Sequence, residues 1–257
     1  MASSDLFSID GKTALVTGGS RGIGKMIAEG FVDAGATVYI SSRKADVCQE
    51  VAEELSKKGT CVAVPADLSK EDECRRLADE MASRVDKLDI LVNNAGATWG
   101  APLADYEEAA FERVLGLNVK GVFHVTKFLV PLLEKAGSQE EPARVINIGS
   151  IDGIQVPVME TYAYSASKAA VHQLTRHLAK RLAPAITVNA IAPGPFESKM
   201  MAATLEAFGD QIRASAPLRR IGRPDDVAGA AIFLASRAGA YVTGAILPVD
   251  GGIATTR

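Results

Sequence analysis

Cysteine, histidine and aromatic residues are scarce in this sequence. The 257 residues include three cysteines, three histidines and one tryptophan, and aromatic residues make up 5% of the chain. Cys48, Cys61 and Cys74 are widely spaced and form no CxxC pair, which argues against both a disulfide framework and a zinc site. We therefore expect no bound metal and a reducing compartment, the cytoplasm.

Long apolar runs and a strong excess of charge are also absent. No run approaches the roughly 20 residues that a membrane-spanning helix needs, and residues 1–10 contain no apolar core of a signal peptide. The formal net charge of -3 does not favour binding to nucleic acid. We expect neither a membrane nor a nucleic-acid partner, whereas a hydrophobic content of 47% is ample for one packed core.

Short apolar runs alternate with helical patterns along the whole chain. The runs are rich in Val, Ile and Leu with little polar alternation, which is typical of strands buried on both faces. They lie at 13–17, 37–41, 61–64, 90–92, 145–148, 186–191 and 246–249, with helical patterns near 23–34, 45–58, 70–86, 107–136, 163–182 and 225–236. This alternation predicts an α/β fold: a single doubly wound Rossmann domain over residues 1–257, with a mostly seven-stranded parallel sheet flanked by helices.

The segment between 193 and 224 follows neither pattern cleanly, and we interpret about 194–223 as a substrate lid. It holds several large apolar residues, which favour a substrate with an acyl or other hydrophobic portion. They are Phe196, Met200, Met201, Leu205 and Phe208. Ordinary packing of the lid explains them nearly as well.

A glycine-rich turn follows the first predicted strand. Residues 17–24 read TGGSRGIG and a helical pattern comes next. In a doubly wound sheet the pyrophosphate of a dinucleotide binds at this first turn. Gly18 allows the sharp turn, Gly22 lets the backbone approach phosphates, and Gly24 lets the helix pack close to the strand. A purely structural strand-to-helix connection is the weaker alternative.

The turn at 17–24 resembles the cofactor turn of the short-chain dehydrogenase/reductase family. Seven further motifs of that family follow in the same order, so the resemblance covers nearly the whole chain. They are ADL at 66–68, NNAG at 93–96, LNV at 117–119, GS at 149–150, YSASK at 164–168, PG at 193–194 and VDGG at 249–252. Within the family the pattern is most similar to the 3-oxoacyl (beta-ketoacyl) reductase branch. The resemblance implies an oxidoreductase with a nicotinamide cofactor and a small-molecule carbonyl or alcohol substrate.

The end of the second predicted strand indicates which cofactor is used. NAD sites usually place an acid there for the ribose 2′-OH, but here Ser42, Arg43 and Lys44 follow the strand. A guanidinium can bind a 2′-phosphate bidentately, and by resemblance Arg21 favours the same choice. We predict NADP(H), while a solvated helix start at Arg43 and Lys44 is the alternative.

The resemblance assigns the cofactor a set of contacts that follow several of the predicted strands. They are Gly18, Ser20, Arg21, Gly22, Ile23, Gly24, Ser42, Arg43, Asp67, Leu68, Asn94, Ala95, Gly96, Tyr164, Lys168, Pro193 and Gly194.

Tyr164 and Lys168 lie one helical turn apart, so both side chains project from one helix face. A nearby ammonium favours phenolate, so we expect the pKa of Tyr164 to fall below its usual value of about 10. Tyr164 would then exchange a proton with a substrate oxygen. Tyr162 is a poorer candidate because Ala166, not lysine, follows it by four residues.

The resemblance completes the catalytic set as Asn118, Ser150, Tyr164 and Lys168. It implies that Lys168 also hydrogen-bonds the nicotinamide ribose, that Ser150 polarises the substrate carbonyl, and that Asn118 supports a proton-relay water. The three histidines, His124, His172 and His177, are isolated in the sequence, and we interpret them as structural.

These residues predict an NADPH-dependent carbonyl reductase that reduces a 3-oxoacyl thioester or related ketone, with an acyl carrier as a potential partner. Asp152 stands where small apolar residues are more usual and could bind a polar substrate group, which would favour a sugar or polyol dehydrogenase. A catalytically silent NADP(H)-binding module is the alternative from another class, but it would not need the four catalytic residues.

The helical patterns at 107–136 and 163–182 carry apolar residues around much of their circumference. Those in the first pattern are Val114, Leu117, Val122, Phe123, Val125, Phe128 and Leu129. A helix that is apolar on two sides needs a second partner, and by resemblance these two helices pair across a two-fold axis. We predict a homotetramer, unless the extra apolar surface is buried within the monomer.

Overall fold

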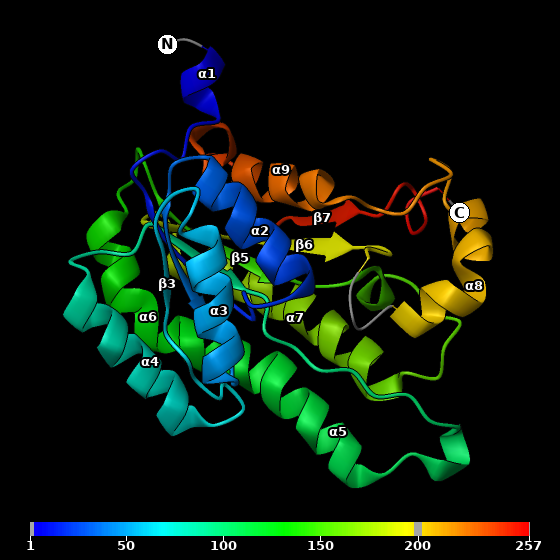
Figure 1. The fold of residues 1–257 in the computed structure, drawn as a ribbon. Helices are drawn as coiled ribbons and strands as arrows, with labels where there is room; N and C mark the ends of the chain where they lie inside the picture. The colour runs from blue at the N-terminus through cyan, green and yellow to red at the C-terminus, as the bar shows by residue number, and fades with distance from the viewer. Residues whose placement is uncertain (1–2, 198–201, 257) are drawn as a thin grey trace.

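A seven-stranded, entirely parallel sheet forms the centre of the computed structural model, which describes residues 3–197 and 202–256 (Figure 1). Its strands are β1 (Thr13–Thr17), β2 (Thr37–Ser41), β3 (Cys61–Ala63), β4 (Ile90–Asn93), β5 (Ala143–Ile148), β6 (Ile186–Pro193) and β7 (Ile246–Val249). The spatial order is β3-β2-β1-β4-β5-β6-β7. This confirms the predicted Rossmann-type sheet, and every strand lies within two residues of its predicted bounds.

The strand order reverses next to β1, which pairs with β2 on one side and with β4 on the other. Ligands of open α/β sheets bind at such a reversal, in the crevice outside the carboxyl ends of the strands. The fold therefore directs attention to the edge of the sheet where β1 and β4 end.

Successive strand residues face opposite layers of helices. In β1, Ala14 and Val16 join the core beneath α2 (Gly22–Asp33), α3 (Ala45–Leu55) and α9 (Pro224–Ala235). Leu15 joins a second core, beneath α4 (Glu71–Arg84), α6 (Val122–Ala136) and α7 (Tyr162–Leu182). Burial on both faces explains why the strands contain almost no polar alternation.

The helix expected over 107–136 consists of three parts. These are α5 (Glu108–Leu115), a π-helical segment over Gly116–Gly121, and α6. A π-helical turn inserts an extra residue into the helical repeat and is frequent at functional sites. Asn118 lies inside it.

Most of the apolar residues singled out on this stretch are buried within the monomer. Val114, Val122, Val125 and Leu129 are at most 6% exposed. Phe123 remains 42% exposed, whereas the ring of Phe128 lies beneath a guanidinium. The unpaired apolar surface is therefore smaller than the sequence suggested.

The proposed lid contains α8 (Ala202–Ser215) and is closed at its base by a parallel bridge between Phe196 and Gly222. Phe196 is 2% exposed and belongs to the core, so it anchors the segment instead of facing a substrate. Phe208 is 53% exposed. Met200 and Met201 lie outside the described residues, as does the side chain of Leu205.

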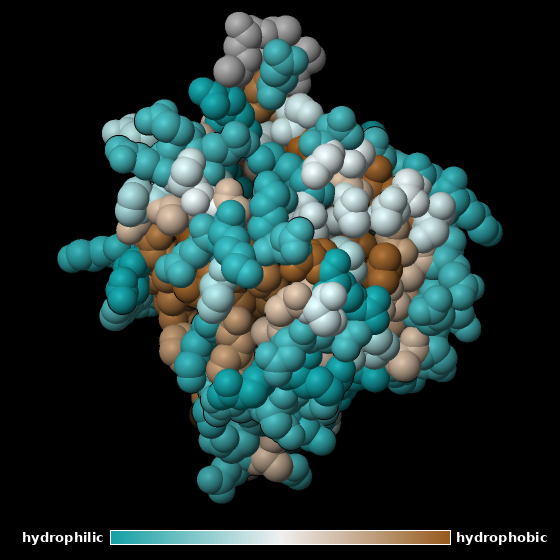
Figure 2. All heavy atoms as spheres, turned by 90° about the vertical axis from the view of Figure 1, so that its left-hand side faces the viewer, coloured by the Kyte–Doolittle hydropathy of each residue, from teal (hydrophilic) through white to brown (hydrophobic). Residues whose placement is uncertain are grey.

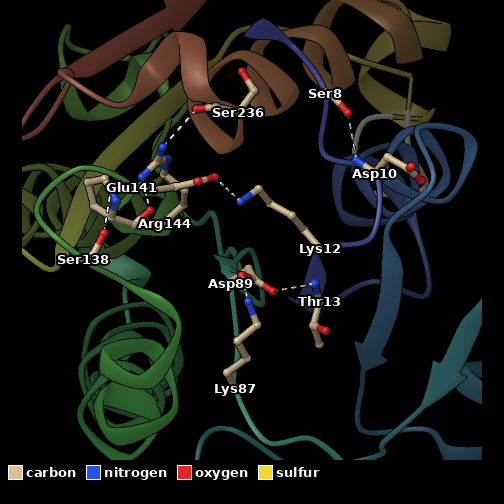
Figure 3. Close-up of polar contacts among 11 residues, drawn as sticks. Ser8, Asp10, Lys12, Thr13, Lys87, Asp89, Ser138, Glu141, Arg144 and Ser236 are labelled. Carbon is tan, nitrogen blue, oxygen red and sulfur yellow. Dashed lines mark hydrogen bonds and ion pairs between the residues drawn. The ribbon is translucent and has the colours of Figure 1, made fainter. Parts of the chain in front are cut away.

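Charged side chains surround the opposite edge of the sheet, where the strands begin. This edge lies on the left in Figure 1 and faces the viewer in Figure 2, where hydrophilic side chains frame an apolar area. Asp89 accepts hydrogen bonds from the Thr13 N–H (2.9 Å) and from Lys87 Nζ (3.2 Å) (Figure 3).

Within the part of the chain that the structure describes, no helix is both long and apolar enough to cross a membrane.

Candidate active site

The residues predicted from the sequence gather at the carboxyl edge of the sheet. Six lie in the turn after β1 and the first turn of α2, two follow β2, two follow β3, three follow β4, and two lie at the end of β6. Ser150 follows β5, and Tyr164 and Lys168 lie in the first two turns of α7. The structure thus brings the predicted cofactor and catalytic residues to one face of the molecule.

The turn after β1 requires glycine at the predicted positions. Gly18 and Gly22 have φ of +65° and +52°, in the left-handed region that residues with a side chain rarely adopt. A Cβ at Gly24 would collide with Asn94 Nδ2 and with the Gly18 carbonyl. The turn is therefore a close backbone cradle in front of the N-terminus of α2, the arrangement that binds a pyrophosphate.

Thr17 and Asn94 hold this turn against β4. Thr17 Oγ1 accepts hydrogen bonds from the N–H groups of Asn94 (3.0 Å) and Ala95 (3.1 Å). Asn94 Nδ2 donates to the carbonyls of Thr17 (3.0 Å) and Gly18 (3.2 Å). The Asn94 side chain is thus occupied by the turn, and sequence reasoning missed Thr17 because a threonine ending a buried strand has no distinctive signal.

Two guanidinium groups lie at the side of the cradle where a 2′-phosphate would bind. The parallel register pairs Thr17 with Ser41, so the turn with Arg21 and the strand end with Arg43 are neighbours. Both arginines are exposed, and neither forms an ion pair within residues 3–197 and 202–256. These residues fit NADP(H), because a phosphate would give both cations a partner.

Other predicted contacts differ in what they can offer a cofactor. Asp67 Oδ1 accepts a hydrogen bond from Ser69 Oγ (2.8 Å), which fixes the carboxylate after β3. The Leu68 side chain is 4% exposed and belongs to the core, so only its backbone could touch an adenine. Gly194 lies so close to Asp250 that a Cβ would stand 2.8 Å from its Cα.

Asn118 is buried and fully bonded. Its Oδ1 accepts from the Ala97 N–H (2.8 Å), and its Nδ2 donates to the Ala97 carbonyl (2.9 Å) and to Ser167 Oγ (2.9 Å). It therefore ties the loop after β4 to α7, next to Tyr164. Its support of a proton-relay water stays a prediction.

The half-buried Tyr164 side chain and the buried Lys168 ammonium form the centre of the site. Lys168 Nζ lies 5.5 Å from the centroid of the Tyr164 ring and donates a hydrogen bond to the Ile148 carbonyl (2.7 Å). Burial raises the pKa of Tyr164 to about 12, although its hydrogen bond with Ser150 opposes this. Burial also lowers the pKa of Lys168 to about 8.

The expectation that the pKa of Tyr164 falls below its usual value is therefore wrong for the protein alone. Lys168 points to a backbone carbonyl, and desolvation of the phenol dominates its pKa. A phenol with a pKa near 12 is protonated at neutral pH, so Tyr164 is prepared to donate a proton to a substrate oxygen.

Ser150 and Asp152 complete the wall of the site. Ser150 Oγ accepts a hydrogen bond from the Asp152 N–H (3.1 Å), and Ser150 is 7% exposed. Burial raises the pKa of the Asp152 carboxyl, while Lys168 opposes the shift. The negative charge of this carboxyl favours the protonated forms of Tyr164 and Lys168. It therefore adds to the rise in the pKa of Tyr164 and opposes the fall in the pKa of Lys168.

Tyr162 points away from this centre. Its hydroxyl donates to Glu160 Oε1 (2.7 Å), and its ring stacks edge-on against Tyr106 at 5.3 Å between centroids. The structure thus separates the two tyrosines in the way that the lysine spacing predicted.

Among the described residues, no three His, Cys, Asp or Glu side chains gather where a metal ion could be held.

A dinucleotide cradle beside a tyrosine–lysine pair on one helix face defines a nicotinamide-dependent oxidoreductase. A family model described as enoyl-(acyl carrier protein) reductase matches residues 18–254. Together with the relatives below, this shows that the chain belongs to the short-chain dehydrogenase/reductase family.

Among curated proteins, the chain is 52% identical over 250 residues to a rhamnolipids biosynthesis 3-oxoacyl-(acyl-carrier-protein) reductase of Pseudomonas aeruginosa, covering 96% of this chain and 97% of that protein. It is 38% identical over 255 residues to the 7alpha-hydroxysteroid dehydrogenase of Escherichia coli, covering 98% of each. Among solved structures, the Pseudomonas aeruginosa RhlG/NADP active-site complex matches with a TM-score of 0.94 and 50% identity, over 97% of this chain and 99% of that one. A gluconate 5-dehydrogenase from Burkholderia cenocepacia, in complex with NADP and tartrate, matches with a TM-score of 0.91 and 34% identity, over 98% of each chain.

Proposed function

We propose that this enzyme uses NADPH to reduce the ketone of a 3-oxoacyl thioester, with Tyr164 as the proton donor. The observation that carries the proposal is the Tyr164 phenol with the Lys168 ammonium 5.5 Å from its ring centroid, on the helix that is bonded to the backbone on either side of Ser150. The 52% identity to a 3-oxoacyl-(acyl-carrier-protein) reductase supports the substrate class. The pair of unpartnered arginines, Arg21 and Arg43, supports the phosphorylated cofactor.

In this reaction the nicotinamide supplies the hydride, and the protein provides orientation and the proton. The Ser150 and Tyr164 hydroxyl groups bind the substrate carbonyl oxygen from one side, which polarises the carbonyl. As negative charge develops on that oxygen, Tyr164 transfers its proton to it. Lys168 stabilises the resulting phenolate by its positive charge.

An acyl substrate also suits the surface around the site. Exposed apolar side chains lie on three parts of the chain. They are Val156, Val158 and Met159, which follow Ser150, then Leu103 on the loop after β4, and Phe208 on α8. The loops are joined because the Ala101 N–H donates to the Glu160 carbonyl (3.2 Å). We infer that 194–223 acts as a lid within one domain, and that an acyl carrier presents the substrate.

A keto sugar is the second candidate, because Asp152 places a carboxyl beside the site. A panel of ketones separates the two: NADPH consumption is measured with 3-oxoacyl thioesters and with keto sugars at equal concentrations. We expect a higher kcat/KM with the thioesters, rising with acyl length. Preference for keto sugars would overturn the thioester assignment, and NADPH fluorescence without any consumption would indicate a silent binding module.

We also infer a homotetramer that works in the cytoplasm, in lipid metabolism. Phe123, exposed on α6, supports assembly. The three cysteines are buried and free, which suits a reducing compartment. Light scattering tests the assembly, because a mass near 27.0 kDa at micromolar concentration would show a monomer.

A further inference from the structure

Three side chains of α7 bind residues 148–153, which carry Ser150 and are called the Ser150 segment below. Lys168 Nζ donates to the Ile148 carbonyl (2.7 Å), and Ser165 Oγ donates to the Asp152 carbonyl (2.7 Å). One turn beyond Lys168, the ring of His172 forms a hydrogen bond with the Gly153 backbone. The first of these contacts belongs to a residue of the catalytic set, whereas the contact of His172 has no part in the mechanism above.

The His172 ring fills the space beside both glycines that flank Ser150. A Cβ at Gly149 would collide with Nε2 of the ring and would lie 2.7 Å from its Cδ2. A Cβ at Gly153 would lie 2.9 Å from its Cε1. The ring is 4% exposed, so it packs as a wedge beneath the Ser150 segment.

Stability alone does not favour a histidine at this position. Its Nε2 is buried and has no hydrogen-bond partner among the residues that the structure describes, which is a cost that an apolar side chain of similar size would avoid. Burial, together with the charges of Lys168 and Arg176, lowers the pKa of His172 to about 4. The ring is therefore neutral at the pH of the reaction, and it can act only through its shape and its bond to Gly153.

We propose that His172 is a positioning residue that sets the Ser150 hydroxyl against Tyr164 and the substrate oxygen. Tyr164, Lys168 and His172 recur at every fourth position of α7, so one helix face carries the proton donor, its cation and the support for Ser150. The inference rests on the proposed function, because it requires Ser150 to act on the substrate.

The test combines His172→Leu with Ser150→Ala. Single-turnover assays with excess enzyme keep slow rates measurable, while NADPH fluorescence gives the Kd and thermal unfolding gives Tm. We expect His172→Leu to reduce the rate of ketone reduction about 10- to 100-fold, the scale of a misplaced catalytic group. Its Kd for NADPH should stay within about twofold, because His172 itself is not among the predicted cofactor contacts and the glycine-rich turn lies on other elements, and its Tm should not fall.

Three comparisons are needed to interpret the result. His172→Gln retains a hydrogen-bond donor and should recover part of the lost rate. His177→Leu, an exposed position on the same helix, should leave the rate unchanged. In the Ser150→Ala background, His172→Leu should cause little further loss, since both substitutions remove the same interaction.

An unchanged rate in His172→Leu would overturn the positioning role, as would an equal loss with and without Ser150. A loss of rate that follows a fall in Tm would equally overturn it. If Ser150→Ala alone kept full turnover, the proposed function of Ser150 would fail, and the role of His172 would fail with it. Full turnover in Ser150→Ala would therefore show that the proposed function of Ser150 is wrong, whereas a loss in Ser150→Ala without a loss in His172→Leu would show that only the role of His172 is wrong.

Discussion

The two edges of the sheet use buried polar groups for different purposes. Where the strands begin, Asp89 is bonded to the Thr13 N–H and to Lys87, and buried Arg144 donates to the carbonyls of Pro142 and Ser236 (Figure 3). Where the strands end, burial shifts the pKa of Tyr164 and of Lys168 away from their ordinary values. At the first edge polar groups only join strands to neighbouring segments, whereas the second edge also holds the Tyr164 hydroxyl and the Lys168 ammonium of the predicted catalytic set.

This difference shows how one sheet separates stability from chemistry. A hydrogen bond at the starting edge stabilises the folded state, and no substrate has to reach it. At the carboxyl edge, desolvation of a phenol and an ammonium destabilises the protein, but it keeps Tyr164 protonated and moves the pKa of Lys168 toward neutral. Substitutions at the two edges should therefore change different measured quantities.

The largest effect is expected at the carboxyl edge, for Tyr164→Phe. The substitution removes the proton donor, so kcat should fall by a factor of the order of 10²–10⁴. The Kd for NADPH and the free energy of unfolding should change little. Tyr162→Phe is the matched control and should be mild, since its hydroxyl bonds Glu160 at the surface. If Tyr162→Phe caused the larger loss, the assignment of the donor would be wrong.

The next effect concerns cofactor selectivity. Arg43→Asp replaces a potential partner of the 2′-phosphate with an acid suited to a ribose 2′-OH. The KM for NADPH should rise roughly 10- to 100-fold, the scale of a lost hydrogen bond between charged groups, and the KM for NADH should not rise. Steady-state assays with both cofactors check this. Equal kcat/KM for NADPH and NADH in the unsubstituted enzyme would contradict the predicted preference.

The starting edge should respond in stability alone. Arg144→Met leaves the Ser236 and Pro142 carbonyls without this donor, and the free energy of unfolding should fall by about 1–3 kcal/mol. Denaturant unfolding measures the change, and kcat of the folded fraction should stay within about twofold. Lys12→Ala, which removes the partly exposed ion pair with Glu141, should cost at most about 1 kcal/mol. A large loss of kcat in Arg144→Met would break the comparison between the edges.

The smallest effect should appear in the pH profile. Because the pKa of Lys168 is about 8, reductive kcat/KM should decline above about pH 8, where the ammonium loses its proton. The Asp152 carboxylate favours the charged form of Lys168, so Asp152→Asn should lower the pKa of Lys168 further. The alkaline limb should then move to lower pH. A limb that does not move would show that another group controls it.

The sequence predicted the sheet well because each strand is a β-branched run between turn residues. It also predicted the pairing of Tyr164 with Lys168, since helical spacing alone puts them on one face. Other features depend on three-dimensional context. The π-helical segment around Asn118 adds one residue to a repeat that periodicity treats as regular. The direction of the Tyr164 pKa shift depends on burial, which spacing does not reveal.

Apolar composition was a weaker guide than periodicity. Phe196 in the lid segment looked like a substrate contact, yet it packs into the core against Gly222. The same holds for Val114 and Val125, whose burial within the monomer removes much of the argument for an interface. Hydrophobicity shows that a side chain avoids water, but it does not show which neighbour covers it.

The bonds between α7 and the Ser150 segment have a consequence for motion during turnover. Ser150, Tyr164 and Lys168 are joined through Ile148, Asp152 and Gly153. The bridge between Phe196 and Gly222 belongs to none of these contacts. We therefore expect the distances among the reacting groups to stay constant over successive substrates.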